Sequence, residues 1–455
     1  MKFIALFFVL LLNQFAFSQQ LLDFKMLRYD EDYTVVKTDS TSTFFDKIKH
    51  IQLTKSDDLY LSFGGELRSQ YQYFKDENWG DTENDKDGFL LNRALFHTDF
   101  HYKKVFRIFS QLQSSTAISR VDPSPVERND LDIHQLFFDF TFDLEKSSLL
   151  FRFGRQEMLY GSQRLVSVRE GPNSRQAFDA VKVVFKNRKF KSDIFYSQSV
   201  KNIPEVFDDR LNPNTRFFGI YNAFNKLPII ENIDFYYLGL KKSSAEFDDA
   251  QGKELRHSVG TRIWRKNHNW NYDVEAVYQF GSVGAKNIEA WTLSLNTSYQ
   301  FATIKFKPIL GLKTEFISGD KKYDDDKIQT FNPLFPKGAY FGLAALVGPS
   351  NLFDIHPSID LELKKDIVFS VDYDIFWRMS RNDGVYQPNT ILMHSGKNTS
   401  KKYIGNQLGA NLNYDVNNWL AFRIEGTWFN TKNYLKEVTS GRDIIFGAAT
   451  VYLRF

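Results

Sequence analysis

Hydrophobic and polar residues alternate over long stretches of this chain. In 291–301 the odd positions carry Trp, Leu, Thr, Tyr or Phe, and the positions between them carry Thr, Ser, Asn or Gln. The segments 369–378 and 420–428 show the same alternation, with charged residues on the polar side. A period of two places successive side chains on opposite faces of a β-strand, and about ten residues allow a tilted strand to cross a bilayer. We therefore predict long strands with one apolar and one polar face.

About eighteen segments of this kind occur along the chain, at 59–73, 89–102, 105–116, 132–143, 148–156, 177–186, 189–199, 216–222, 233–240, 254–264, 270–281, 289–301, 305–318, 357–364, 367–378, 402–414, 418–429 and 443–455. Short polar turns join some of them, and long polar loops are expected at 74–88, 117–131, 157–176, 319–356 and 379–401. Alternation of short turns with long loops is typical of transmembrane barrels.

A soluble β-sandwich is the main alternative, but its strands are commonly only about five or six residues long. Here the polar faces carry charges of both signs, which indicates a water-filled lumen inside an apolar wall. Because backbone groups in lipid must all be hydrogen-bonded, such a sheet has to close on itself. The predicted fold is all-β: a transmembrane antiparallel β-barrel of about eighteen strands over 59–455.

The first residues have the features of a secretory signal peptide. Lys2 precedes an apolar run over 3–12, and small residues at Ala16 and Ser18 predict cleavage after residue 18. We interpret 1–18 as the signal peptide, with an N-terminal membrane anchor as the alternative. The next segment, 19–58, is expected to form a short periplasmic tail or a small insert in the lumen. It is too short for the folded plug of a large receptor.

Composition agrees with an exported membrane protein and excludes other classes. The 455-residue chain has no cysteine, so neither disulfides nor thiolate metal sites are available to it. Aromatic residues make up 16%, which suits the aromatic girdles of a barrel. The net charge of +3 gives no reason to expect a nucleic-acid partner. The expected surroundings are the lipid bilayer and the outer-membrane assembly machinery, in the outer membrane of a Gram-negative bacterium.

The last segment ends in Phe455 behind alternating apolar residues. This pattern resembles the recognition signal of bacterial outer-membrane barrels, although a buried edge strand of a soluble protein can show it as well. We expect the strand that ends at Phe455 to pair with the first one, within 61–73, because an open edge in lipid is not tolerated.

Basic residues on the polar faces are the candidates for selectivity. By alternation the early strands point Arg68, Arg93, Arg107 and Arg152 into the lumen, and later strands add Lys313 and Arg423. Acidic residues dominate the strands between 270 and 375. We expect most of these charges to form pairs, because an unpaired charge in a narrow pore is costly. Alternatively, each of these residues belongs to a ladder of ion pairs that only maintains the round cross-section of the barrel.

The loop 157–176 is the second candidate. It contains Arg164, Arg169 and Arg175, with Arg155 just before it, and only the acids Glu157 and Glu170. Arginine binds carboxylates through two parallel hydrogen bonds, so a loop of this kind can bind an anionic group. The alternative is a solvated loop held by local salt bridges. In either case we expect the loop charges to add little to folding stability.

Four stretches in order along the chain carry a family resemblance. They are 27–33 with 61–68; 153–165 with Arg169, Asn173, Arg175, Phe178 and Asp179; 318–320 with 330–336; and 351–352 with 374–377, Asp383, Tyr386 and 404–405. Together they resemble the alginate-export family of outer-membrane porins. That resemblance implies an eighteen-stranded barrel and an arginine-rich constriction for an anionic uronate polysaccharide, with Arg155, Arg164, Arg169 and Arg175 in or beside the selectivity region.

The function expected from these features is an outer-membrane channel for anionic solutes, with uronate-type oligo- or polysaccharides as the implied class. The predicted lumen has about as many acids as bases, which favours a broader group of porins over a dedicated alginate exporter. An outer-membrane enzyme, a receptor and a structural barrel are the alternatives. Pairs such as Asp372 with Asp374 suit glycoside hydrolysis, but lumen ladders contain them without chemistry. We expect no catalytic residues, no cofactor and no metal, although His97 and His101 share one strand face.

Overall fold

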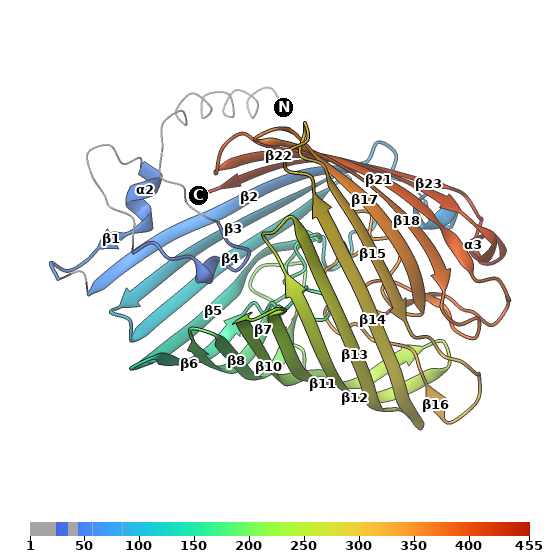
Figure 1. The fold of residues 1–455 in the computed structure, drawn as a ribbon, viewed down its shortest axis with the longest axis horizontal. Coiled ribbons are helices and arrows are strands. Elements are labelled where there is room, and N and C mark those ends of the chain that lie inside the picture. Colours follow the sequence, from blue (N-terminus) through green and yellow to red (C-terminus); the bar gives the residue numbers. More distant parts are fainter. Residues whose placement is uncertain (1–23, 35–43, 57, 84) are drawn as a thin grey trace.

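The computed structural model describes residues 24–34, 44–56, 58–83 and 85–455. The predicted signal peptide, 1–18, lies outside the described residues. Eighteen antiparallel strands close into one barrel, with the first barrel strand (blue) beside the last ones (red) in Figure 1. None of the described helices is long and apolar enough to cross a membrane.

The barrel strands are β2 (Leu59–Lys75), β3 (Phe89–Tyr102), β4 (Phe106–Ile118), β5 (Asn129–Leu144), β6 (Ser147–Gln156), β7 (Phe178–Asn187), β8 (Phe190–Lys201), β10 (Thr215–Leu227), β11 (Glu231–Phe247), β12 (Ala250–Arg265), β13 (Trp270–Val283), β14 (Lys286–Gln300), β15 (Ile309–Ile317), β17 (Leu352–Lys364), β18 (Ile367–Arg378), β21 (Tyr403–Asp415), β22 (Leu420–Thr431) and β23 (Ile444–Arg454). The shorter elements are η1 (Arg28–Asp30), α2 (Phe44–Lys49), β1 (Ile51–Gln52), η2 (Glu77–Gly80), β9 (Arg210–Leu211), β16 (Lys327–Ile328), β19 (Val385–Tyr386), β20 (Leu392–His394) and α3 (Asn433–Val438).

Closure of the barrel occurs where the prediction places it. Strand β23 pairs with β2 from Arg454 opposite Glu66 to Ile445 opposite Lys75. Beyond that ladder, the N–H of Phe455 donates to the carbonyl of Gly65 at 3.0 Å, and the N–H of Gly65 donates back at 2.8 Å. The seam is therefore hydrogen-bonded to its last residue, as lipid requires.

The two faces of the wall differ as the alternation predicts. Side chains such as Leu67, Phe96 and Phe138 are exposed on the outside, at 46%, 45% and 40%. Their neighbours in sequence point inward, where Arg68 and Asp139 are both 2% exposed. Apolar groups outside and buried charges inside are the arrangement of a membrane barrel whose lumen is largely filled.

All eighteen predicted segments correspond to strands of the barrel, and the differences lie at their ends. Strand β11 continues to 247, past the predicted end at 240, because its main chain pairs with β12 although the side chains of 241–246 are mostly polar. Strand β17 begins at Leu352, five residues before the predicted 357. Because β17 begins earlier, Asp354 and His356 lie in the barrel wall and not in the predicted loop.

The strands are joined differently at the two ends of the barrel. At one, which we call the short-turn end, connections such as 145–146, 188–189 and 365–366 are two residues long. At the other, the long-loop end, the connections include 157–177, 318–351 and 379–402. The five predicted long loops therefore lie at one end, as expected, although 248–249 and 284–285 at that end are also two residues long and 301–308 at the short-turn end has eight residues.

Two of the long loops fold into the barrel and form a core there. The N–H of Phe335 donates to the carbonyl of Leu165 at 2.9 Å, and the N–H of Ser167 donates to the carbonyl of Phe335 at 2.9 Å. Phe335 packs edge-on against Phe178 of β7, with ring centroids 4.9 Å apart. The inward loops 157–177 and 318–351 thus bind each other and the wall, and they divide the interior.

The described part of the N-terminal segment also enters the lumen. Tyr29 is 4% exposed and packs against Phe109 and Phe137, which face inward from β4 and β5. Its hydroxyl donates to the carbonyl of Glu157 at 2.8 Å. The guanidinium of Arg152 lies 4.1 Å from the centre of the Tyr29 ring. Of the two arrangements expected for this segment, a periplasmic tail or an insert in the lumen, residues 28–33 form the insert.

Candidate functional site

Arg68 holds the inward loop 157–177 against the wall. It lies on the lumen face of β2, as predicted, and is 2% exposed. Its guanidinium donates to the carbonyls of Glu170 at 2.8 Å, Gly171 at 3.2 Å and Pro172 at 2.9 Å. Three carbonyl acceptors take most of the donors of one arginine fork. Arg68 therefore positions the loop through its main chain.

Arg93 performs the same task through carboxylates. It lies opposite Arg68 in the ladder of β2 and β3 and forms an ion pair with Glu66 at 2.6 Å. It also contacts the carboxylate of Glu170 from the loop. Glu66 in turn pairs with Arg454 at 3.1 Å, next to the seam of the barrel. Arg93 is thus buried in a network and is not available to a solute.

Arg175 is buried at the other end of the same loop. It forms an ion pair with Glu157 at 2.7 Å and donates to the carbonyl of Met26 at 2.8 Å. His134 lies 2.8 Å from the same Glu157 carboxylate. These contacts join the loop to the N-terminal insert, so Arg175 also has a structural role.

Arg164 crosses the interior to the strands on the far side. Its Nη1 lies 2.5 Å from Oε1 of Glu315 on β15, and its Nε lies 3.6 Å from Glu275 on β13. Nη2 donates to the hydroxyl of Thr292 at 3.3 Å. The Arg164 side chain is only 10% exposed and that of Glu315 is fully buried. The loop is therefore packed inside the barrel, and the solvated alternative does not hold for it.

Four other predicted residues belong to paired ladders on the wall. Each basic group has an acid on the lumen face within reach: Arg107 with Asp99 at 2.5 Å, Arg152 with Asp139 at 2.7 Å, Lys313 with Glu315 at 3.3 Å, and Arg423 with Glu425 at 2.9 Å. The expected pairing of lumen charges is confirmed for these positions.

Arg155 does not lie with the other arginines. It stands opposite Leu136 in the ladder with β5, and two residues after Phe153, and both of these side chains are exposed on the outside of the wall. Arg155 pairs there with Asp179 of β7 at 2.9 Å. Strict alternation along β6 thus turns Arg155 away from the lumen, and its expected place in the selectivity region is corrected.

Arg169 differs from every other arginine of the loop. Among the residues that the structure describes, no carboxylate or carbonyl is within hydrogen-bond distance of its guanidinium, and the side chain is half-buried. Burial lowers the pKa of Arg169 to about 10, so it remains charged at neutral pH. The side chain lines a cavity of about 800 Å³ that opens beneath η2 and the long loops. Arg169 is therefore a charged group that faces a cavity without a partner.

A second cavity of about 490 Å³ lies on the other side of the inward loops. Arg164, Lys313 and Lys337 line it, and Lys337 has no carboxylate partner within the described ranges. The ammonium of Lys337 lies 5.6 Å from the ring centre of Tyr340. Burial lowers the pKa of Lys337 to about 8, so most molecules keep this charge at pH 7. Sequence reasoning missed Lys337, because it lies in a loop and carries no motif.

A thin septum separates the two cavities. Pro336 and Gly338 line the first cavity, whereas Lys337 between them lines the second. A Cβ added to Gly171 meets the Cβ of Ala339 at 2.9 Å, so the two inward loops touch here without side chains between them. We call residues 336–339 with Gly171 the septum. It carries Lys337 on one side and lies close to Arg169 on the other.

The histidines that share a face of β3 are not arranged as metal ligands. His97 stacks on Phe109 with ring centroids 5.3 Å apart, and His101 lies 3.0 Å from Asp99. In the described part of the chain, the groups of His, Asp and Glu that are close enough to share an ion lie elsewhere and contain neither residue.

Comparisons with known proteins agree with this architecture. A family model described as alginate export matches residues 59–442. No curated protein matches the chain in sequence.

Solved structures of similar fold include proteins from pseudomonads. A BenF-like porin from Pseudomonas fluorescens Pf-5 is 9% identical, with a TM-score of 0.58 over 87% of this chain and 98% of that one. OccK2 (OpdF) of Pseudomonas aeruginosa, solved in complex with glucuronate, is 10% identical, with a TM-score of 0.57 over 87% and 98%. OccD3 (OpdP) of the same organism is 11% identical, with a TM-score of 0.57 over 90% and 94%. At such identities the likeness concerns the fold alone.

Proposed function

The chain belongs to the alginate-export family and is an outer-membrane β-barrel channel of a Gram-negative bacterium, and we propose that it conducts anionic solutes, with uronate-type saccharides as the class. Insertion by the outer-membrane assembly machinery is part of this proposal. The long-loop end is then extracellular, as in other barrels of this kind.

The observation that carries the proposal is the pair of free cations on the two sides of the septum. Arg169 faces the larger cavity and Lys337 the smaller one, and neither has an acidic partner in the described structure. Almost every other basic group of the lumen that sequence analysis singled out is already neutralised by an acid. An anion that reaches the septum therefore meets a cation without an ion-pair partner on either side, after passing the carboxylates of Glu77, Glu83, Asp85 and Asp122 where it comes through the larger cavity.

The chemistry of these two groups favours a carboxylate. A guanidinium presents two parallel donors that match the two oxygens of a carboxylate. The site is partly desolvated, which strengthens such a contact compared with bulk water. A single free arginine, with a lysine beyond it, binds weakly enough to release the solute again, as conduction requires. A neutral sugar lacks the charge that both groups would attract.

Passage requires the septum to move. The contact with Gly171 is made by the main chain and the small side chain of Ala339, and no ion pair of the described residues crosses it. A small displacement of these residues would join the two cavities, whereas the buried pair of Arg164 with Glu315 holds the rest of the loop in place. The proposal thus assigns gating to the septum and attraction to Arg169 and Lys337.

Ion selectivity in planar bilayers tests this function. The reversal potential in a KCl gradient should show anion preference for the wild-type barrel, and Arg169→Gln should shift it towards cations. Arg128→Gln is the matched control, because Arg128 is an exposed loop arginine whose partner is Asp130. A cation-selective wild type, or equal reversal potentials for wild type and Arg169→Gln, would refute the proposal.

A further inference from the structure

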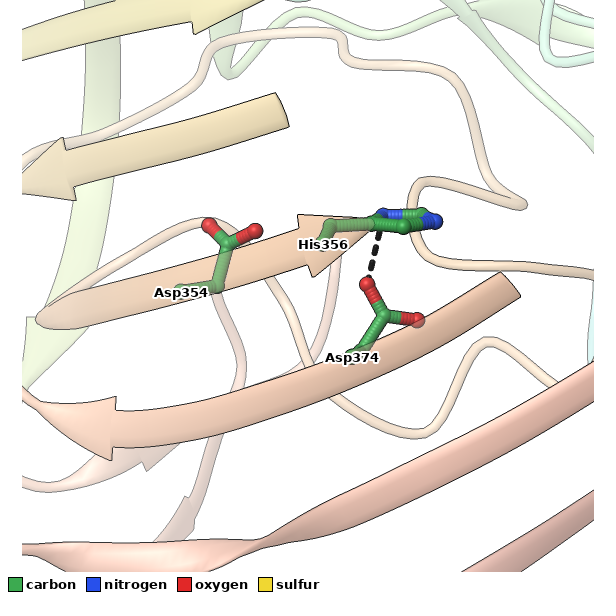
Figure 2. Close-up of side chains that lie close together, drawn as sticks. All are labelled: Asp354, His356 and Asp374. Atoms are coloured by element: carbon green, nitrogen blue, oxygen red, sulfur yellow. Dashed lines mark ion pairs between the residues drawn. The ribbon is translucent and has the colours of Figure 1, made fainter. Parts of the chain in front are cut away.

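Three side chains on neighbouring strands converge on the lumen face of the wall. Asp354 and His356 are two residues apart on β17, so they share one face, and Asp374 lies on the same face of β18. Figure 2 shows the His356 ring above the Asp374 carboxylate, with Asp354 beside them. One donor atom from each residue lies within 4.8 Å of the others.

The carboxylate of Asp354 is buried without compensation. The residue has no exposed surface, and neither of its oxygens has a hydrogen-bond partner in the described part of the structure. A buried carboxylate without a donor is costly, and proteins normally pair such a group or coordinate it to a metal. Asp374 is equally buried, and its Oδ1 meets only Nδ1 of His356, at 2.5 Å.

Further acidic groups nearby add to the uncompensated negative charge of this cluster. Glu315 lies directly opposite Asp354 in the ladder with β15, and Asp372 lies 3.5 Å from the other nitrogen of His356. The nearby cations are Lys313 of β15 and Arg164 of the inward loop 157–177, and both already pair with Glu315. The cluster therefore contains more negative than positive charge, and a bound cation would balance it.

The local ladder is interrupted at the same point. Strands β17 and β18 pair from Leu352 to Ile355 and again from Ser358, but not at the positions between. Pro357 occupies one of these positions and has no N–H to donate. A ligand shared by His356 and Asp374 would connect the strands where the main chain does not.

We propose that Asp354, His356 and Asp374 bind one divalent transition-metal ion, with Zn²⁺ as the best match. One imidazole with two carboxylates suits zinc, which takes nitrogen and oxygen ligands at about 2.0–2.2 Å in a four-coordinate site. Calcium takes six to eight oxygen ligands, whereas this cluster offers only two carboxylates and one imidazole nitrogen. A water would complete the four ligands.

The site is linked to the inward loop 318–351. The side-chain amide of Gln407 donates to Oδ2 of Asp374 at 3.2 Å and to the carbonyl of Phe341 at 2.6 Å. Phe341 packs edge-on against Phe376 of β18, with ring centroids 5.1 Å apart. An ion on Asp374 would thus stabilise the anchor of the loop that carries the septum.

A second cluster of acidic residues shows that closeness alone does not indicate a metal site, because one of its carboxylates already has donors. Asp132, Asp208 and Asp209 also lie close together. There, however, one oxygen of Asp132 accepts the N–H groups of Asp208 and Asp209 at 3.0 and 2.9 Å. Main-chain donors already satisfy that carboxylate, so it gives no reason to expect a metal.

Metal analysis of the purified barrel tests the site. Chelator-treated protein in detergent micelles is equilibrated with Zn²⁺, and bound zinc is measured by mass spectrometry together with the thermal unfolding midpoint. We expect one zinc per wild-type chain and a raised midpoint. Asp354→Asn and His356→Gln should each weaken zinc binding about tenfold or more. Asp360→Asn, on the same face of β17 but outside the cluster, should bind as the wild type does.

Two results would overturn the assignment. One is a wild-type barrel that takes up no more zinc than Asp354→Asn. The other is equal uptake and equal stabilisation in all variants, which would indicate adventitious binding elsewhere. Because Asn has nearly the size of Asp, Asp354→Asn should assemble normally, and heat-modifiable mobility on a gel confirms that each variant is folded before zinc is added.

Discussion

The guanidinium of Arg164 lies 2.5 Å from the carboxylate of Glu315 and joins the inward loop to a strand nearly opposite in the order of the barrel. Both side chains are buried, so neither is well solvated when its partner is removed. Breaking a buried pair costs about 3–5 kcal/mol. The arginines of this loop therefore divide into two that hold the structure, Arg164 and Arg175, and one that faces a cavity, Arg169.

We predict that Arg164→Ala destabilises the barrel by up to about 3–5 kcal/mol, because the buried Glu315 loses its closest cation and keeps only Lys313 at 3.3 Å. Arg169→Ala, with no partner to lose, should change stability by less than about 1 kcal/mol. Urea unfolding in micelles measures both. In a Glu315→Gln background the cost of Arg164→Ala should fall, and an unchanged cost would mean that the pair does not stabilise the loop.

Removal of Arg68 should release the loop that it anchors. Arg68→Met deletes the donors to the carbonyls of Glu170, Gly171 and Pro172. We expect a larger and noisier single-channel conductance, since the loop 157–177 no longer stays against the wall. Arg128→Met is the control for removal of an arginine without a loop contact. Identical conductance traces for Arg68→Met and wild type would show that the anchor has no influence on the pore.

A cross-link across the septum should block the channel. The chain has no cysteine, so Gly171→Cys with Ala339→Cys introduces the only pair. A Cβ added to Gly171 would lie 2.9 Å from the Cβ of Ala339, and a shift of about 1 Å gives the separation that a disulfide prefers. Conductance should fall under oxidation and return on reduction, whereas each single cysteine variant should be indifferent to both. Full conductance of the oxidised double variant would place the path elsewhere.

The pH dependence of selectivity should report Lys337. Burial lowers the pKa of Lys337 to about 8, so its charge is present below that pH and is lost above it. Anion preference should therefore decrease between pH 7 and pH 9, while Arg169, with a pKa of about 10, stays charged over most of that range. Lys337→Met should remove this transition, and Lys305→Met, at an exposed turn, should retain it. A transition that survives Lys337→Met belongs to another group.

Local patterns were sufficient to predict the wall of the barrel. Each strand pairs with neighbours that have the same period of two, so residues such as Leu67 and Arg68 are assigned to their faces from sequence alone. The ends of strands were less certain, because main-chain pairing continues where side chains turn polar, as in β11. Closure at Phe455 followed from the requirement that lipid leaves no strand edge open.

The interior could not be predicted in the same way. Whether a loop folds inward depends on contacts between distant segments, such as Arg68 with the carbonyls of 170–172, and no periodicity reports them. Arg155 shows the opposite error, since the resemblance placed it in the pore while the alternation along β6 turns it outward. Asp354 and His356 were overlooked because the strand was expected to begin at 357, although their spacing of two was visible.

Uptake by proteoliposomes tests the central claim most directly. Glucuronate and glucose differ mainly by one carboxylate, so their relative rates measure the preference that Arg169 and Lys337 are proposed to create. Radiolabelled glucuronate should enter vesicles that contain the wild-type barrel faster than glucose does, and Arg169→Gln should reduce this difference. Equal rates for the two solutes through the wild-type barrel, or faster entry of glucose, would contradict the assignment of an anion channel.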